Sequence, residues 1–271
     1  MEKVVTLIPV RNEEHFINAV IKSIVHQTHP IEEIVVVDDG SSDQTASILK
    51  ELNKIYHKIT ILSRPNRGYS AVGRPEIAVT FNTGFNYIKK KLKPDYILII
   101  GGDTIIPTNY TESLLNEFSK DRSLAIASGI PRYEYIHQSH VAGSGRMIDV
   151  RFLEYCNWQY PILYCWESYC LFKATSLGLN CRSFSDIISD RLRRGGGTIN
   201  YINYGRGLRE LGYHPIAVIF RAIRSVRRFG AKSSIGLISG YFMSPIFKCE
   251  PELRSFVWKH RILQALPSFI R

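Results

Sequence analysis

The stretch VVVDDGSSDQT, residues 35–45, ends a run of β-branched apolar residues on two adjacent carboxylates. Such a run is typical of a strand buried in a sheet, whereas a protein interior accepts acids only when they have partners. Asp38 and Asp39 either make a turn before the next helix or face a ligand at the end of the strand. We expect Asp43 to cap that helix, and we favour a ligand site for the two adjacent acids.

Apolar runs alternate with helical patterns through the first half of the chain. Strands are predicted over residues 4–10, 33–39, 58–64, 95–103 and 123–129. Helices are predicted over 44–56, 76–91 and 107–120, and a further helix is expected to follow Asn12 as its cap, with Glu13 and Glu14 in its first turn. This alternation predicts an α/β fold, in which a mainly parallel, Rossmann-like sheet is flanked by helices.

Polar segments follow three of the predicted strands at the points where the strands end. These segments are 9–13, 38–42 and 101–103. In open sheets of this kind, ligands bind beyond the carboxyl ends of the strands. We therefore expect the three segments to gather along one edge of the sheet and to form a binding site there.

Taken together, IPVRNEE at residues 8–14, VVVDDGSSDQT at 35–45 and a fourth strand ending in GGD resemble family 2 glycosyltransferases with the GT-A nucleotide-sugar-binding fold. The resemblance covers about residues 1–215, and its specificity lies in the joint order and spacing of the motifs. It implies an inverting hexosyltransferase of glycan biosynthesis. Such an enzyme moves a sugar from a nucleoside diphosphate sugar to an acceptor hydroxyl.

The same resemblance implies positions for the nucleotide sugar. The nucleotide pocket would be lined by Pro9, Arg11, Asn12 and Glu13. Asp38 would meet the base, and Asp39 or Ser41 would lie close to the base or the ribose. A basic residue near the diphosphate is expected in the following loop, where we choose Arg74 with Arg67 behind it. For both arginines, a solvated loop position is an equal alternative.

The metal motif of the family, Asp-x-Asp, reads Gly101-Gly102-Asp103 in this chain. The resemblance implies that Asp103 holds Mg²⁺ or Mn²⁺ against the diphosphate, next to Gly102. One carboxylate with phosphate oxygens and waters still provides the oxygen ligands that Mg²⁺ prefers. We expect a divalent cation as cofactor with reduced affinity. Capping of the next turn is the alternative role of Asp103.

For the catalytic base, the family frame of an acidic pair before a short helix fits WESYCLFKATSLGLNC at residues 166–181. Ser168 replaces the second acid, so Glu167 is the candidate base, and an acid at a helix start is the alternative. Asp186 and Asp190 are further candidates. Asp190, Arg191 and Arg193 belong to a segment that either contacts the diphosphate or acceptor, or is a solvated basic turn.

The net positive charge of the chain comes from its C-terminal part. The net charge is +11, and residues 191–271 contain 15 Lys and Arg against three acids. A helical pattern places Ile216, Ile219, Phe220, Ile223 and Val226 together, with arginines mostly on the other side. We predict a catalytic domain over 1–205 and a basic amphipathic tail over 206–271 that binds an anionic membrane surface. The alternative is an ordinary helix packed on the domain.

Several other classes are disfavoured by what the sequence lacks. It has no membrane-length apolar stretch, no signal-peptide pattern and no C-x-x-C pair. Together with the resemblance, the basic tail suggests peripheral attachment on the cytoplasmic face of a membrane and a lipid-linked or membrane-borne acceptor. No G-x-G-x-x-G follows the first strand, which disfavours a dinucleotide oxidoreductase. Two alternatives stay open: a degenerate, non-catalytic sugar-nucleotide-binding protein, and, less favoured, a nucleic-acid-binding protein. No nucleic-acid partner is expected.

Overall fold

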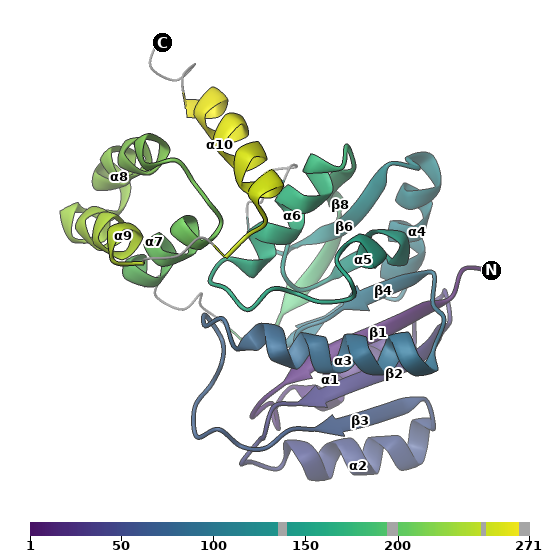
Figure 1. Cartoon of the computed structure of the whole chain (residues 1–271). Coiled ribbons are helices and arrows are strands. Elements are labelled where there is room, and N and C mark those ends of the chain that lie inside the picture. The colour runs from purple at the N-terminus through teal and green to yellow at the C-terminus, as the bar shows by residue number, and fades with distance from the viewer. Residues whose placement is uncertain (135–139, 194–199, 245–247, 266–271) are drawn as a thin grey trace. The chain divides into compact units, whose positions relative to one another are not determined.

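The computed structural model of the chain (Figure 1) describes residues 1–134, 140–193, 200–244 and 248–265. Its contacts divide the chain into two compact units. The first comprises Met1–Ala71, Ala78–Tyr160 and Gly178–Arg194, and the second comprises Val72–Ile77, Pro161–Leu177 and Gly195–Arg271. This division differs from the predicted boundary at residue 205, which remains a prediction about functional domains.

The first unit is a sheet with helices on its faces. Its strands are β1 (Val4–Val10), β2 (Ile31–Asp38), β3 (Ile59–Ser63), β4 (Tyr96–Ile99), β5 (Thr104–Ile105), β6 (Leu124–Pro131), β7 (Arg146–Asp149) and β8 (Asn180–Arg191). Its helices are α1 (Ile17–Val25), α2 (Thr45–Tyr56), α3 (Ile77–Lys91), α4 (Tyr110–Lys120) and α5 (Val150–Tyr155). The strand order is β3-β2-β1-β4-β7-β6-β8-β5.

The predicted α/β fold is confirmed, with three strands that the sequence did not predict, namely β5, β7 and β8. Strands β1 to β4 pair in parallel, as expected. Strand β7 lies between β4 and β6 and runs antiparallel to both. Alternate residues of β1 face opposite layers, because Ile8 belongs to the core around α1 and α2, whereas Leu7 contacts Gly84 of α3.

The start of α1 differs from the prediction. Asn12 does not cap this helix, which begins at Ile17 after Phe16. Asn12 adopts a left-handed φ of 55°, and its side-chain oxygen accepts a hydrogen bond from Ser42 N at 2.8 Å. The asparagine therefore joins two loops at the sheet edge. The N-cap residue of α2 is Gln44, one residue after the expected Asp43, whose carboxylate nevertheless accepts a hydrogen bond from Thr45 N at 3.0 Å.

The register of the sheet brings the predicted polar segments to one edge. Val10 of β1 lies opposite Asp38 of β2, and Leu7 lies opposite Ile99 at the end of β4. Because all three strands run in the same direction, the segments that follow them emerge on the same side. The grouping expected from the sequence is therefore present in the first unit.

The second unit is helical over the residues that the structure describes. It contains α6 (Trp166–Ser176), α7 (Tyr201–Glu210), α8 (Pro215–Phe229), α9 (Ala231–Met243) and α10 (Pro251–Ala265). A Cβ added to Gly205 would lie 2.1 Å from Leu237 O, and one added to Gly240 would lie 2.0 Å from Ile202 O. The backbones of α7 and α9 therefore touch at glycines. None of the described helices combines the length and the apolar character that crossing a membrane requires.

Candidate functional site

The carboxylate of Asp38 lies at the end of β2 and is 4% exposed. Its Oδ1 accepts hydrogen bonds from Ser41 N at 2.9 Å and from Ser41 Oγ at 2.6 Å. Ser41 Oγ also accepts a hydrogen bond from Asn12 N at 3.0 Å. The turn that follows β2 is therefore fixed to the loop that follows β1, and three of the predicted site residues are in contact.

The neighbouring acid, Asp39, is 2% exposed and is compensated by two arginines. Its Oδ1 lies 3.1 Å from Arg64 Nε and also contacts Arg67. Arg11 donates hydrogen bonds to the backbone oxygens of Asp39 and Gly40, at 2.5 and 2.7 Å. Asp39 and Arg11 thus hold the ends of β1, β2 and β3 together, and Arg67 lies beside Asp39.

A second group of charges lies at the end of β4. Arg193 Nη2 donates a hydrogen bond to Glu13 Oε2 at 2.7 Å, and Arg193 Nε lies 3.8 Å from Asp103 Oδ2. The arginine side chain is 51% exposed, whereas those of Glu13 and Asp103 are 13% and 22% exposed. One half-exposed guanidinium therefore bridges two partly buried carboxylates that come from different strand ends.

Gly102 makes the approach of Glu13 to this segment possible. A Cβ added to Gly102 would lie 2.7 Å from Glu13 Cγ, which is closer than side-chain carbons approach each other. The absence of a side chain here therefore leaves room for the glutamate. Glu13 N also donates a hydrogen bond to Thr45 Oγ1 at 2.7 Å, which fixes the glutamate from the side of α2.

The pKa of Glu13 is raised above its usual value, chiefly by burial. Arg193 lowers it by attraction and by its hydrogen bond, and the neighbouring Asp103 raises it. Burial also acts to raise the pKa of Asp43, but hydrogen bonds from Thr45 and from the backbone of Glu14 outweigh it and lower the pKa. Glu13 and Asp43 thus differ in the direction of their pKa shifts, although both lie at this edge of the sheet.

The remaining predicted residues of the first unit have partners outside these two groups. Asp190 forms a bidentate pair with Arg132, at 2.5 and 3.0 Å, which lowers the pKa of Asp190. Arg191 Nη1 lies 3.0 Å from Glu134 Oε1. Of the three charged candidates in this segment, Arg193 is the one whose side chain contacts Glu13 and Asp103, and Leu192 N donates a hydrogen bond to Asp103 O at 2.8 Å.

The exposed Arg74 and the half-buried Glu167 belong to the second unit, so their proposed roles remain predictions. Glu167 lies in the first turn of α6. Sequence reasoning missed Arg64 and Asn66, which bind Asp39 and Arg11. The sequence could have pointed to Arg64, because this arginine ends the third apolar run and so lies at the end of a predicted strand.

The edge of the sheet thus offers carboxylates, a hydroxyl and guanidinium groups to a ligand. Carboxylates accept hydrogen bonds from base N–H and ribose hydroxyl groups, and guanidinium groups bind phosphates. Across the parts of the chain that the structure describes, no three His, Cys, Asp or Glu residues converge as a metal site. A metal at Asp103 therefore requires further oxygen ligands from a bound molecule.

Comparisons with known proteins agree on a family and a fold. Residues 6–178 match the family model described as glycosyl transferase family 2. Glycosyltransferase GlyA of Streptococcus pneumoniae serotype 4 is 29% identical over 145 residues, 52% of this chain and 19% of GlyA. Poly-beta-1,6-N-acetyl-D-glucosamine synthase of Staphylococcus epidermidis is 26% identical over 149 residues, 55% of this chain and 33% of the synthase. The chain thus spans about a fifth to a third of these curated relatives.

Two solved structures share the fold at low sequence identity. Mannosyltransferase PcManGT from Pyrobaculum calidifontis, in complex with GDP-Man and Mn²⁺, has a TM-score of 0.61 at 15% identity, covering 98% of this chain and 76% of that one. S. aureus TarS in complex with UDP-GlcNAc has a TM-score of 0.58 at 16% identity, covering 99% and 80%. The predicted GT-A fold is thereby confirmed.

The charges around Glu13 predict opposite effects of two substitutions on its pKa. In a carbon-13 NMR titration, Glu13 should titrate above its ordinary value of 4.5, because burial disfavours its charged form. Arg193→Gln should raise the pKa further by removing an attractive charge, and Asp103→Asn should lower it by removing a repulsive one. A midpoint at or below 4.5 in the unsubstituted protein, or shifts of equal sign, would contradict this electrostatic account.

Proposed function

This chain belongs to glycosyl transferase family 2, and we propose that it transfers a sugar from a nucleoside diphosphate sugar to an acceptor hydroxyl with inversion at the anomeric carbon. The observation that carries the proposal is the grouping of Asp38, Glu13, Arg193 and Asp103 at the carboxyl edge of β1, β2 and β4. The relatives named above are glycosyltransferases, and the solved neighbours bind GDP-Man or UDP-GlcNAc.

In this proposal, the nucleotide lies along the edge from β2 to β4. Asp38 accepts a hydrogen bond from the base, while Ser41 holds its Oδ1 in place. Asp39 is already compensated by Arg64 and Arg67, so it positions the loops around the nucleotide. Arg193 lies close enough to Asp103 to contact the diphosphate, and Arg74 is a second candidate for that contact.

A divalent cation fits the residues at Asp103 in part. Asp103 and the nearby Glu13 offer carboxylate oxygens, which are the ligands that Mg²⁺ and Mn²⁺ prefer. PcManGT, a structural neighbour, was solved with Mn²⁺. When bound, the cation would neutralise charge that develops on the departing diphosphate. Asp103 would hold it together with phosphate oxygens of the donor.

Glu167 is the proposed base. It would remove the proton of the acceptor hydroxyl while that oxygen attacks the anomeric carbon. The bond from this carbon to the diphosphate oxygen breaks, and the nucleoside diphosphate leaves with the bonding electrons. Attack from the face opposite the leaving group inverts the configuration. Asp186 and Asp190 are the alternative bases, although Asp190 is paired with Arg132.

Donor binding tests the nucleotide site directly. In isothermal titrations with UDP, GDP and their sugar conjugates, Asp38→Asn should weaken binding by about 10-fold or more, because a hydrogen bond to a charged group is lost. Asp103→Asn should abolish the difference between Mn²⁺ and EDTA. Asp121→Asn, which alters an acid before β6 that hydrogen-bonds Ser123, is the control. If no conjugate binds under any condition, the site assignment is wrong.

Substitution of the base should separate transfer from binding. Glu167→Gln should lower kcat by about 10²–10⁴-fold with donor affinity unchanged, because a general base acts on the transition state. Ser168→Ala is the matched control and should retain activity. Proton NMR of the product should show the inverted anomeric configuration. Full activity of Glu167→Gln would move the base to Asp186 or Asp190, and donor binding without transfer would favour the non-catalytic alternative.

We propose further that α8 and α9 attach the protein to an anionic membrane surface, where the acceptor is a lipid-linked or membrane-borne glycan. The described side chains that α8 buries are few, namely Val218, Ala222 and Ser225, and Ser225 and Ser234 share a hydrogen bond at 2.7 Å. Large apolar side chains point outward instead; they are Ile216, Ile219, Ile223 and Val226 on α8, and Ile235, Phe242 and Met243 on α9.

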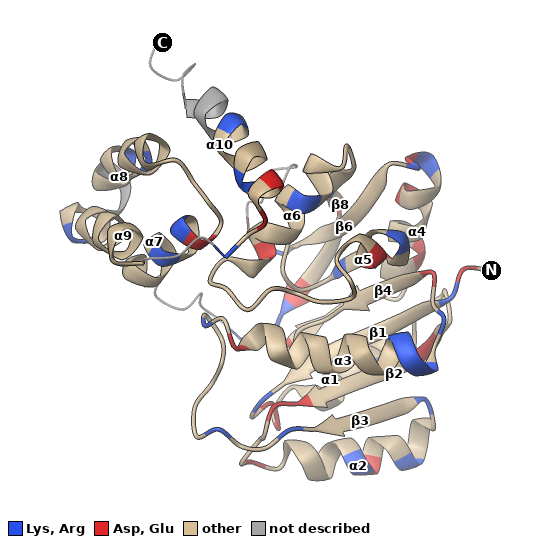
Figure 2. Cartoon of the chain, in the orientation of Figure 1, with Lys and Arg blue, Asp and Glu red and all other residues tan. Residues whose placement is uncertain are grey.

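The charge of this region supports a lipid surface as the partner. No Asp or Glu occurs between Leu211 and Cys249, whereas six Lys and Arg do. Figure 2 shows basic residues and no acidic ones along α8 and α9. Arg224 and Lys232 are exposed beside the apolar side chains. An apolar face flanked by basic residues binds an anionic membrane in two ways: its apolar side chains insert among the lipids, and its basic side chains attract the negative headgroups.

Vesicle binding tests the membrane proposal. The protein should co-sediment with vesicles that contain phosphatidylglycerol, and less with phosphatidylcholine alone or at high salt. Ile219→Asp with Ile223→Asp should reduce binding by about 10-fold or more, because two apolar side chains no longer insert. Ile55→Asp, on α2 and 65% exposed, is the control. Equal retention of both variants, or preference for nucleic acid over vesicles, would contradict the proposal.

A further inference from the structure

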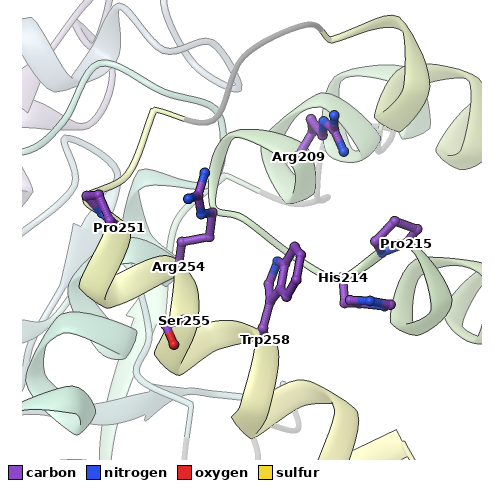
Figure 3. Close-up of a pocket in the computed structure, with 7 residues that line it drawn as sticks. All are labelled: Arg209, His214, Pro215, Pro251, Arg254, Ser255 and Trp258. Atoms are coloured by element: carbon purple, nitrogen blue, oxygen red, sulfur yellow. The ribbon is translucent and has the colours of Figure 1, made fainter.

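The second unit contains a cavity of about 530 Å³ that the proposed transfer reaction does not use. Figure 3 shows its walls, which are the end of α7 with Arg209, the start of α8 with His214 and Pro215, and the side of α10 with Arg254 and Trp258. Sites for small molecules have volumes of about 300–1,000 Å³. The cavity is therefore large enough for a saccharide or a molecule of similar size.

The cavity presents positive charge from two directions. Arg209 and Arg254 line it, and no Asp or Glu is among the described residues that do so. The guanidinium of Arg209 lies over the ring of Tyr241 at 5.1 Å, and its Nη1 donates to Tyr241 Oη at 3.3 Å. Two guanidinium groups at one cavity are suited to an oxyanion such as phosphate, which they bind through paired hydrogen bonds.

The position of Arg254 depends on the backbone opposite it. Gly212 has a φ of +80°, and a Cβ on it would lie 2.5 Å from Arg254 Cγ. The stem of Arg254 therefore rests directly on the turn between α7 and α8. Lys248 lies 2.8 Å from Glu210, and Glu250 accepts a hydrogen bond from Tyr169 at 2.6 Å. Glu210 and Glu250 are thus paired with Lys248 and Tyr169, which are not among the residues that line the cavity.

The remaining wall is apolar and aromatic. Trp258 is 37% exposed, and its ring meets that of His214 edge to face, with centroids 4.8 Å apart. His214 Nδ1 accepts a hydrogen bond from Ile216 N at 3.2 Å, which fixes the imidazole at the start of α8. Pro215 and Pro251 complete the wall. An aromatic face with neighbouring prolines is suited to the C–H face of a sugar ring.

We infer that this cavity binds a saccharide that carries a phosphate group. Arg209 and Arg254 take the phosphate, and Trp258 packs against the sugar ring. The inference deepens the proposed function, on which it rests for identifying the ligand as part of the acceptor. Free sugar phosphates and lipid-linked sugar phosphates share this chemistry, and binding experiments distinguish the two sources.

Titration of the full-length protein with a hexose 1-phosphate, followed by tryptophan fluorescence, tests the cavity. We expect a saturable change that disappears in Trp258→Phe, because Trp258 is the reporter within the cavity. Arg254→Gln should weaken binding by about 10-fold or more, since a charged hydrogen-bond donor is lost. Arg182→Gln, an exposed arginine of β8 outside the cavity lining, is the control and should bind as the unsubstituted protein does.

The ligand series identifies which groups are recognised. The hexose 1-phosphate should bind more tightly than either inorganic phosphate or the neutral hexose, because each lacks one half of the contacts. A prenyl-linked hexose phosphate in detergent forms the second arm, and tighter binding of this form assigns the ligand to the lipid-linked source. Binding of the soluble form with equal or greater affinity assigns it to the free sugar phosphate. Either result supports the cavity as the site.

Two controls keep this inference separate from the donor site. Asp38→Asn should leave hexose 1-phosphate binding unchanged, so loss of nucleotide binding and loss of this binding can be told apart. Trp258→Ala, measured by calorimetry, repeats the test in case Arg254→Gln unfolds, which thermal unfolding will show. The inference is overturned if no ligand gives a saturable change, or if folded variants at Arg254 and Trp258 bind as tightly as the unsubstituted protein.

Discussion

A buried carboxylate at the end of β2 determines how the site edge is built. Asp39 is almost inaccessible to solvent, and an unpaired charge at such a position is strongly destabilising. Arg64 and Arg67, from the segment after β3, supply the opposite charge, and Arg11, from the end of β1, binds the adjoining carbonyl groups. One acid thus fixes three segments, and the position of Asp38 depends on them.

The acids Glu13 and Asp103 at the end of β4 differ from Asp39 in that their shared partner is partly exposed to solvent. Arg193 is shared between Glu13 and Asp103, and its side chain is half exposed, so the pairing is accessible to a ligand. Where family 2 enzymes commonly carry the first acid of the metal motif, this chain has a glycine, and Glu13 approaches the segment beside Gly102. Two carboxylates therefore lie near the end of β4, as in the Asp-x-Asp motif, but one of them, Glu13, comes from the loop after β1.

The sequence predicted what depends on local pattern. The parallel strands β1 to β4, their helices and the common edge of their ends follow from apolar runs and from the direction of the chain. It did not predict β5 and β7, because their two and four residues are too few for a pattern to stand out. It also missed the twelve-residue β8, in which polar residues interrupt the apolar ones. Nor could it reveal the pairing of Glu13 with Arg193, since these residues are 180 positions apart. The cap assigned to Asn12 was wrong because a tertiary contact with Ser42 outweighs local propensity.

The second unit shows why an amphipathic pattern alone does not say which face of a helix is buried. The apolar stripe of α8 would ordinarily be expected to form a core. In α7 and α9, however, the glycines allow the backbones to touch, and serines join α8 to α9, so close approach and hydrogen bonds define the interior. Val218 of α8 and Leu237 and Tyr241 of α9 are buried as well, whereas the stripe of Ile216, Ile219, Ile223 and Val226 is exposed. The small residues allow the close approach of the helices, and the exposed stripe of α8 is left as an apolar surface.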